Sequence, residues 1–118
     1  MSARDRVLAI DVGTQSVRAL VFDAAGTLCA RAQVPIEPPY HAPEPGWAEQ
    51  DAEVFWQATV SACRALADEP QAAVDRIAGI ALTTQRATAV FAAEDGTPLR
   101  PAISWLDQRE AATVPALP

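Results

Sequence analysis

The stretch Ile10-Asp11-Val12-Gly13-Thr14-Gln15-Ser16-Val17-Arg18 decides the fold, because it places a short polar turn between two apolar runs. Residues 7–10 and residues 17–22 are apolar enough to predict two buried β-strands. Gly13 lets the backbone bend sharply and approach a ligand closely. The stretch therefore predicts a β-hairpin whose turn lies at Gly13.

The turn also carries groups that suit a nucleotide phosphate. Amides and hydroxyls around Gly13, Thr14 and Ser16 can donate to phosphate oxygens, and Asp11 can hold a hydrated divalent metal ion. On spacing alone two interpretations stay open. One is a phosphate-binding turn, and the other is an ordinary hairpin loop, since hairpin turns favour glycine for steric reasons.

Length and charge restrict the class of protein. The 118 residues amount to about one domain, and 50% hydrophobic with 20% charged residues is typical of a globular protein. A net charge of −6 argues against non-specific binding to nucleic acid or to an anionic membrane. No apolar run approaches the roughly 20 residues that span a bilayer, and no signal-peptide core follows the start. Cys29 and Cys63 lack metal-ligand spacing and predict free thiols, so we expect a cytoplasmic protein.

The order of elements predicts an α/β protein with a β-meander, then a helix, then further strands. A turn at residues 23–26 leads to a third strand over residues 27–34, which makes an antiparallel meander. Prolines crowd residues 35–47, so this segment is predicted to be an extended surface loop. Residues 77–83 predict a fourth strand of the interior type.

One helix is clearly predicted over residues 52–67, with Asp51 as its N-cap. Both flanks of its apolar face are themselves apolar, so we expect burial on more than one side and core positions for Phe55 and Trp56. Residues 94–97 predict a second hairpin turn. The stretch from Asp107 onward predicts the capped start of another short helix.

Three polar clusters fall at predicted strand ends, at residues 11–18, at Gln85 and Arg86, and at residues 105–109. Ligands of α/β sheets gather at the carboxyl ends of strands. Arg86 offers a planar fork of donors for hydroxyls or a carboxylate, and Trp105 offers a flat apolar wall for a sugar. Asp107 can accept from paired hydroxyls. The alternatives are a surface ion pair for Arg86, a core position for Trp105 and a helix cap for Asp107.

The order of four motifs resembles the N-terminal part of the FGGY carbohydrate kinases, a family that includes glycerol kinase, xylulokinase and ribulokinase. The motifs are Asp-x-Gly-Thr-x-Ser-x-Arg, Pro-Gly-Trp-x-Glu-Gln-Asp, Thr-x-Gln-Arg-x-Thr and Trp-x-Asp-x-Arg. They stand at residues 11–18, 45–51, 83–88 and 105–109. The resemblance implies a ribonuclease-H-like, actin-like ATPase fold in which two domains close over ATP, Mg²⁺ and a sugar or polyol.

The resemblance also assigns roles to individual residues. Asp11 would face the metal ion and the phosphates, and Arg18 would be catalytic by stabilising charge on the transferred phosphoryl group. The implied cofactor-binding residues are Asp11, Gly13, Thr14, Gln15, Ser16 and Arg18, with Asp11 as the metal ligand. The implied substrate-binding residues are Gln85, Arg86, Ala87, Trp105 and Asp107.

The chain departs from the family pattern at Ala87. Glycerol kinases place a glutamate there, and xylulokinases place a Met-His pair where Arg86 and Ala87 stand. Without that carboxylate one acceptor for substrate hydroxyls is lost, which argues against glycerol. The Trp-x-Asp-x-Arg ending is more similar to the pentulose-type members. Neither feature is specific enough for the sequence to identify the substrate.

The resemblance implies that residues 1–118 form roughly the first half of the first of two domains. The aspartate that accepts the proton from the substrate hydroxyl, and the second domain, lie beyond this length in the family. We therefore expect this chain alone to be inactive and the full-length protein to be a carbohydrate kinase. The expected partner is a small sugar or polyol, with neither nucleic acid nor membrane, and a homodimer is an assembly that the sequence allows.

Two other classes stay open. A non-catalytic actin-like or ribonuclease-H-like module could use the same half-fold to bind a partner through its unfinished sheet edge. A ribonuclease-H-like nuclease would need several acidic residues that meet around a metal ion. The strands predicted at residues 17–22 and 77–83 carry no acidic residue, which does not favour a nuclease.

Overall fold

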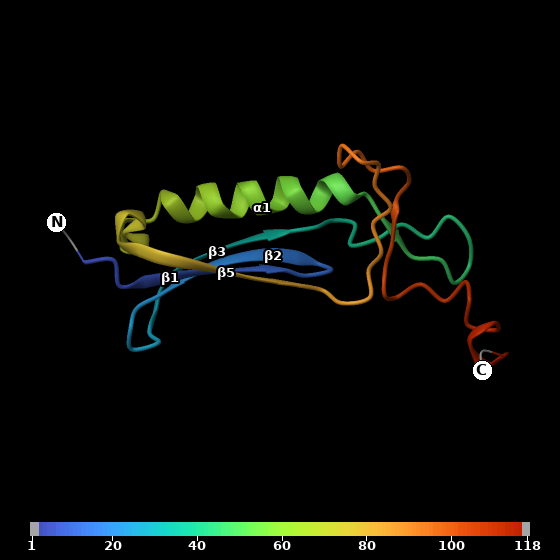
Figure 1. The fold of residues 1–118 in the computed structure, drawn as a ribbon, viewed down its shortest axis with the longest axis horizontal. Coiled ribbons are helices and arrows are strands. Elements are labelled where there is room, and N and C mark those ends of the chain that lie inside the picture. Colours follow the sequence, from blue (N-terminus) through green and yellow to red (C-terminus); the bar gives the residue numbers. More distant parts are fainter. Residues whose placement is uncertain (1–2, 117–118) are drawn as a thin grey trace.

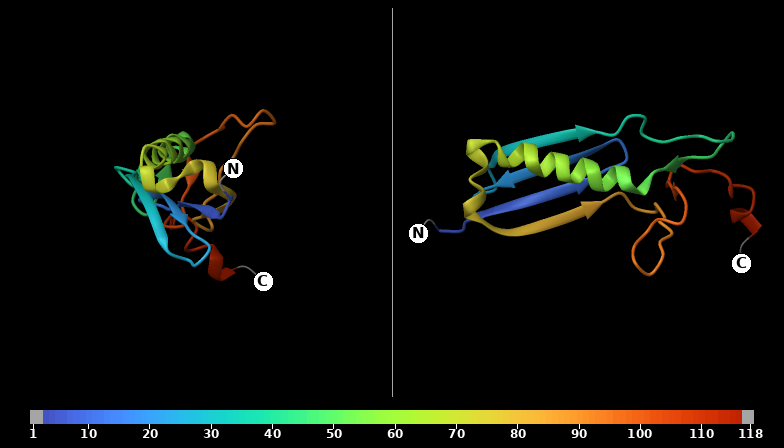
Figure 2. Two further views of the ribbon diagram at one scale, coloured as in Figure 1. Left: turned by 90° about the vertical axis from the view of Figure 1, so that its left-hand side faces the viewer. Right: turned by 90° about the horizontal axis from the view of Figure 1, so that it is seen from above.

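A four-stranded sheet forms the base of the molecule. We describe residues 3–116 of a computed structural model. The strands, labelled in Figure 1 and seen side by side in the right-hand view of Figure 2, lie in the order β3-β2-β1-β5; the first three pair antiparallel, and β5 runs parallel to β1. The predicted meander is therefore confirmed. The strand bounds are Arg6–Val12 for β1, Ser16–Phe22 for β2, Leu28–Pro35 for β3 and Ile77–Thr84 for β5.

One helix, α1 (Ala52–Ala67), lies along one face of this sheet (Figures 1 and 2). It begins as predicted at Asp51, whose side chain accepts a hydrogen bond from the backbone N–H of Glu53 at 3.0 Å. The helix packs on β2 and β3. The residues that it buries are Ala58, Ala62 and Leu66, one per turn or so.

The expectation that α1 is buried on more than one side is wrong. Trp56 is 61% exposed and Val54 is 38% exposed, because only the stripe facing the sheet is covered in residues 3–116. Trp56 is therefore no core residue here, whereas Phe55 is half-buried against the core.

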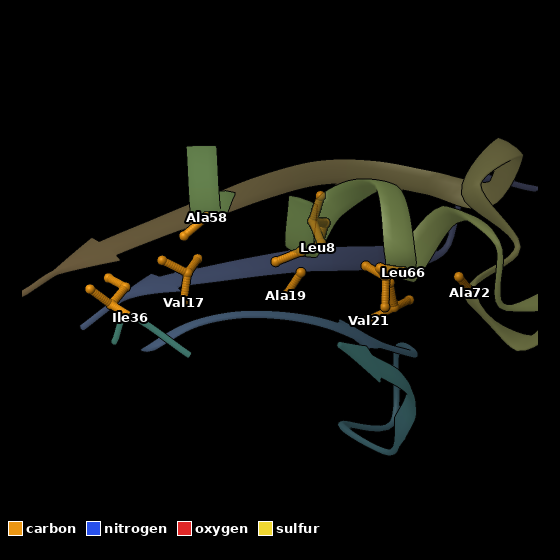
Figure 3. Close-up of a cluster of buried hydrophobic side chains, with 9 residues drawn as sticks. Leu8, Val17, Ala19, Val21, Ile36, Ala58, Leu66 and Ala72 are labelled. Carbon is orange, nitrogen blue, oxygen red and sulfur yellow. The ribbon is translucent and has the colours of Figure 1, made fainter. Parts of the chain in front are cut away.

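The core fills the layer between α1 and the sheet (Figure 3). Its largest fully buried side chains come from β2 and α1, and Ile36 closes one end. Cys29 and Cys63 are free thiols, as predicted, and burial raises the pKa of Cys63. The buried cluster comprises Leu8, Val17, Ala19, Val21, Ile36, Ala58, Ala62, Leu66 and Ala72.

Strand β5 is less buried than its sequence predicts. It lies at the edge of the described sheet, where Ile80 is 67% exposed and Leu82 is 66% exposed. An apolar run indicates that both faces of a strand are buried, but it does not indicate which segment of the protein buries them. The prediction of an interior strand is therefore not met by residues 3–116.

A second, two-stranded sheet stands beyond the carboxyl ends of β1 and β5. It pairs β4 (Glu49–Gln50) antiparallel with β6 (Ala102–Ile103). Between α1 and β5 the chain forms two short 3₁₀ turns, η1 (Pro70–Ala72) and η2 (Val74–Arg76). In the described part of the chain no helix is long and apolar enough to cross a membrane.

The chain after β6 differs from its prediction. No helix begins at Asp107; residues 105–113 form turns instead, followed by the 3₁₀ turn η3 (Val114–Ala116). Asp107 does cap, but it caps a turn, because its Oδ1 accepts from the backbone N–H of Arg109 at 3.0 Å. Its other oxygen accepts from a distant residue, Ala48, which draws the segment away from helical geometry.

Candidate functional site

An open cleft of about 690 Å³ lies at the carboxyl ends of β1 and β5. The two strands are parallel neighbours, so Asp11 pairs with Thr83, and Gln85 N–H donates to Val12 O at 2.9 Å. The hairpin turn after β1 and the segment after β5 therefore meet at one edge, where α/β sheets place their ligands. The cleft is lined by Asp11, Gly13, Thr14, Thr84, Gln85, Arg86, Ala87 and Trp105.

The turn at Gly13 is tight. Gly13 N–H donates to Ser16 O at 3.0 Å, and a Cβ added at Gly13 would lie only 3.0 Å from that same oxygen. A larger residue here would have to push the Ser16 carbonyl aside by a few tenths of an ångström, so the turn favours glycine. The amide of Gly13 is used within the turn, whereas Gln15 is exposed and its carbonyl accepts from Ile36 N–H at 2.8 Å.

Ser16 is placed differently from its expected phosphate-binding role. It is 6% exposed, and its hydroxyl accepts from Gln33 Nε2 at 3.0 Å. It does not line the cleft. Its oxygen atoms serve the turn and the neighbouring strand β3, which keeps the bend in shape.

Asp11 and Arg18 face each other across the hairpin. They are directly paired residues of β1 and β2, and Arg18 donates to Asp11 Oδ2 at 2.8 Å. Their side chains are 32% and 49% exposed. Exposed ion pairs contribute little to stability, so a metal ion or a phosphate can replace either partner at small cost.

A second wall of the cleft comes from the segment after β5. Arg86 and Ala87 line the cleft, and Ala87 has a φ of 56°, in the left-handed region that side chains rarely adopt. Non-glycine residues in this region occur preferentially at functional sites. The backbone at Ala87 is thus strained at the place where the sequence lacks a carboxylate.

A hydrogen bond from its indole N–H holds the Trp105 ring in place. Its Nε1–H donates to Thr14 Oγ1 at 2.8 Å, and Thr14 in turn donates to Gln85 Oε1 at 2.6 Å. Trp105 nevertheless stays 53% exposed, so it is no core residue in this chain. These contacts bring the predicted phosphate turn, Gln85 and Trp105 into one site.

Asp107 is not brought to the cleft. Its side chain is 4% exposed, and its carboxylate accepts from Ala48 N–H at 2.7 Å and from the Arg109 guanidinium at 2.7 and 2.8 Å. The Arg109 guanidinium holds the pKa of Asp107 well below its usual range. A role in binding substrate hydroxyls stays a prediction that this geometry does not support.

Arg109 lies at the centre of a group of side chains of which the sequence analysis assigned a role only to Asp107. Its guanidinium lies 3.8 Å from the centroid of the Trp47 ring and donates to Glu49 Oε1 at 2.8 Å. The hydrogen bond to Asp107, and after it the one to Glu49, raises the pKa of Arg109. We call Trp47, Glu49, Asp107 and Arg109 the Arg109 cluster. The only signal for it was that two of the motifs contain its members.

The cleft holds one carboxylate for a metal ion. Within residues 3–116 no group of three or more His, Cys, Asp or Glu side chains is arranged to bind a metal. Mg²⁺ in phosphoryl-transfer sites is commonly held by one or two carboxylates together with substrate phosphates and water. Asp11 fits that requirement, with phosphate oxygens as further ligands.

Comparison with known proteins identifies the family. Residues 6–118 match the model of the N-terminal domain of the FGGY family of carbohydrate kinases. The chain belongs to this family. A glycerol kinase from Rhodospirillum centenum is 42% identical over 118 residues, which are 99% of this chain and 23% of that protein.

Solved structures of FGGY kinases have the same fold. A xyloylose kinase from Brucella ovis matches with a TM-score of 0.83 and 35% identity, over 94% of this chain and 24% of that chain. A Plasmodium falciparum glycerol kinase solved with ADP matches with a TM-score of 0.69 and 24% identity, over 98% of this chain and 23% of that chain. The chain therefore has the N-terminal part of the actin-like ATPase fold, and it spans about a quarter of the length of these relatives.

Proposed function

We propose that the full-length protein is an ATP-dependent kinase that transfers the γ-phosphoryl group to a hydroxyl of a sugar or polyol. The observation that carries this proposal is that Asp11, Thr14, Arg86 and Trp105 line one and the same cleft. A phosphate donor and a hydroxylic acceptor would thus meet at one edge of the sheet.

The hairpin side suits the nucleotide. Asp11 would hold Mg²⁺, which supplies charge neutralisation at the phosphates when bound. The backbone and hydroxyl of Thr14 and the exposed Gln15 would face phosphate oxygens. Arg18, displaced from Asp11 by the metal ion, would be free to stabilise charge on the transferred group.

The other wall suits the acceptor. Arg86 presents several N–H donors to hydroxyl oxygens, and Trp105 presents an apolar ring to the C–H face of a sugar. Ala87 supplies no carboxylate. The named relatives act on different acceptors, glycerol and xyloylose, so we propose the class of sugar or polyol and no single compound.

We propose that the general base of the reaction lies outside residues 1–118, as the resemblance to the family implies. The acceptor oxygen would attack the γ-phosphorus, the bond to the ADP oxygen would break, and the hydroxyl proton would pass to a general base. We place that base, and the adenosine-binding domain, in the remaining length of the protein. We therefore propose that the 118-residue chain alone forms no ADP from ATP and a sugar.

We place the full-length kinase in the cytoplasm. ATP is its proposed phosphoryl donor, and free thiols such as Cys29 and Cys63 are typical of a reducing compartment. A homodimer stays part of the proposal, to be tested by the molar mass of the full-length protein in solution.

The test is ATP consumption by the full-length protein with a panel of polyols and ketoses. We expect ADP formation with at least one acceptor, and a fall in kcat of at least about 100-fold for Asp11→Ala with the fold retained. Asp68→Ala is the matched control, because Asp68 is exposed at the far end of α1. A protein that binds partners without turning over ATP, or an Asp11→Ala variant with unchanged kcat, would contradict the kinase and favour a non-catalytic module.

A further inference from the structure

Gln50 lies behind the cleft and contacts both of its walls. It belongs to β4, is 3% exposed, and does not line the cleft. Its Nε2 donates to Pro39 O at 2.6 Å and to Thr14 O at 3.2 Å, so both amide protons are used. Its Oε1 accepts from Gln85 Nε2 at 3.5 Å, the longest of these contacts.

These contacts close a ring of hydrogen bonds. Thr14 Oγ1 donates to Gln85, Gln85 donates to Gln50, and Gln50 returns to the carbonyl of Thr14. Trp105 donates into the ring through Thr14. We call Thr14, Gln50, Gln85 and Trp105 the polar joint.

The direction of each hydrogen bond in the polar joint is fixed by chemistry. An indole N–H can only donate and a backbone carbonyl can only accept. The series that starts at Trp105 and ends at the carbonyl of Thr14 thus leaves one consistent orientation for the amides of Gln85 and Gln50. Because the amide of Gln50 is buried and both its N–H groups and its oxygen are used, one arrangement of the groups that it joins is favoured.

Gln50 is held in place through its neighbour Glu49. Its neighbour Glu49 is 7% exposed, accepts from Arg109 at 2.8 Å and also pairs with Arg100. The backbone of Glu49 exchanges two hydrogen bonds with His41, at 2.7 and 2.8 Å. The Arg109 cluster therefore fixes the backbone from which the Gln50 side chain reaches the cleft.

We infer that Gln50 is a positioning residue for phosphoryl transfer, because its amide joins the phosphate turn at Thr14 to the acceptor wall at Gln85. The inference rests on the proposed kinase function and adds to it. It means that the two walls keep one spacing, so that donor and acceptor meet in a reactive geometry. Small displacements of reacting groups can reduce a rate by about 100-fold.

The test uses the full-length protein with Gln50→Leu, which keeps similar volume and removes every hydrogen bond of the amide. We expect kcat to fall about 10- to 100-fold at saturating ATP and acceptor. Amide hydrogen exchange, followed by mass spectrometry, should become faster in residues 13–16 and in residues 84–88. Gln57→Leu is the matched control, since Gln57 is exposed on α1 and its side chain donates to Glu53, one turn away on the same helix, at 3.2 Å.

A second variant covers the case in which Gln50→Leu does not fold. Gln50→Glu keeps the shape but, when ionised, cannot donate to Thr14 or Pro39; we expect the same loss of kcat. A folded variant with kcat within twofold of wild type, and with faster exchange confined to residues near Gln50, would overturn the inference. If the wild-type protein turns over no acceptor, the proposed function fails, and hydrogen exchange at residues 13–16 alone decides whether Gln50 positions the turn.

Discussion

The two ends of this molecule are held together by different forces. Under α1, Leu66, Val17 and Val21 are fully buried and the contact is apolar (Figure 3). Beyond the strand ends, β4 and the cleft are held by the polar joint and the Arg109 cluster. Apolar burial is non-directional, whereas a hydrogen bond requires a defined distance and angle.

The directional hydrogen bonds explain why the cleft has a defined shape although no helix within residues 3–116 packs over that part of the fold. At that end few large apolar side chains are buried, and the buried polar residues are Ser16, Glu49, Gln50 and Ser104. Removing an apolar contact at the first end should mainly reduce stability. Removing a polar contact at the second end should mainly change geometry and therefore activity.

The largest effect on stability is expected at the apolar end. Leu66→Ala should lower the free energy of unfolding of the 118-residue chain by about 2–5 kcal/mol, since Leu66 is 2% exposed and a cavity would remain. Leu28→Ala is the control, because Leu28 is 44% exposed at the start of β3. This variant should change the free energy of unfolding by no more than about 0.5 kcal/mol. Urea unfolding followed by circular dichroism measures both. Equal effects would show that α1 does not cover the core as described.

A smaller loss of stability is expected from Arg109→Lys. Lysine keeps the charge but loses the planar fork to Asp107 and Glu49 and the stacking on Trp47. The thermal midpoint should fall by several degrees. Arg100→Lys is the matched comparison, because Arg100 also pairs with Glu49 but its side chain is 40% exposed, and its midpoint should hardly move. The reverse order would mean that the Arg109 cluster does not support β4.

The smallest expected effect is on the pH dependence of the unfolding free energy in acid. The pKa of Asp107 is lowered in the folded chain from an ordinary value of 3.8, chiefly by the Arg109 guanidinium. The unfolded chain therefore takes up the proton first as the pH falls, so this carboxylate stabilises the fold above about pH 4 and loses that contribution below it. Asp107→Asn should make the unfolding free energy depend less on pH between about pH 5 and 3. An unchanged slope would show that other carboxylates dominate acid unfolding.

The hairpin of β1 and β2 and the start of α1 were predictable from the sequence because their signals are local. The turn at Gly13 joins strands that are adjacent in the chain, and Asp51 caps a helix within its own first turn. Periodicity and turn chemistry report such contacts directly. They do not report which faces stay uncovered, and so Trp56 and Ile80 were assigned more burial than residues 3–116 provide.

The polar end was predictable only in part because its contacts are distant in sequence. Thr14 and Gln85 are 71 residues apart, and Thr14 and Trp105 are 91 residues apart. A shared site for these residues was predictable only from the general rule that ligands of α/β sheets bind at the carboxyl ends of strands. No local pattern separates Arg86, which lines the cleft, from Asp107, whose carboxylate is taken by Ala48 and Arg109.

The most direct test of the account is a crystal structure of the full-length protein with Mg²⁺ and a non-hydrolysable ATP analogue. We predict that the phosphates lie against the turn of residues 13–15, that the metal ion contacts Asp11, and that Arg18 has left Asp11 for a phosphate oxygen. An analogue bound elsewhere, with the Asp11–Arg18 pair intact and the cleft beside Thr14 filled by protein side chains, would contradict the central claim.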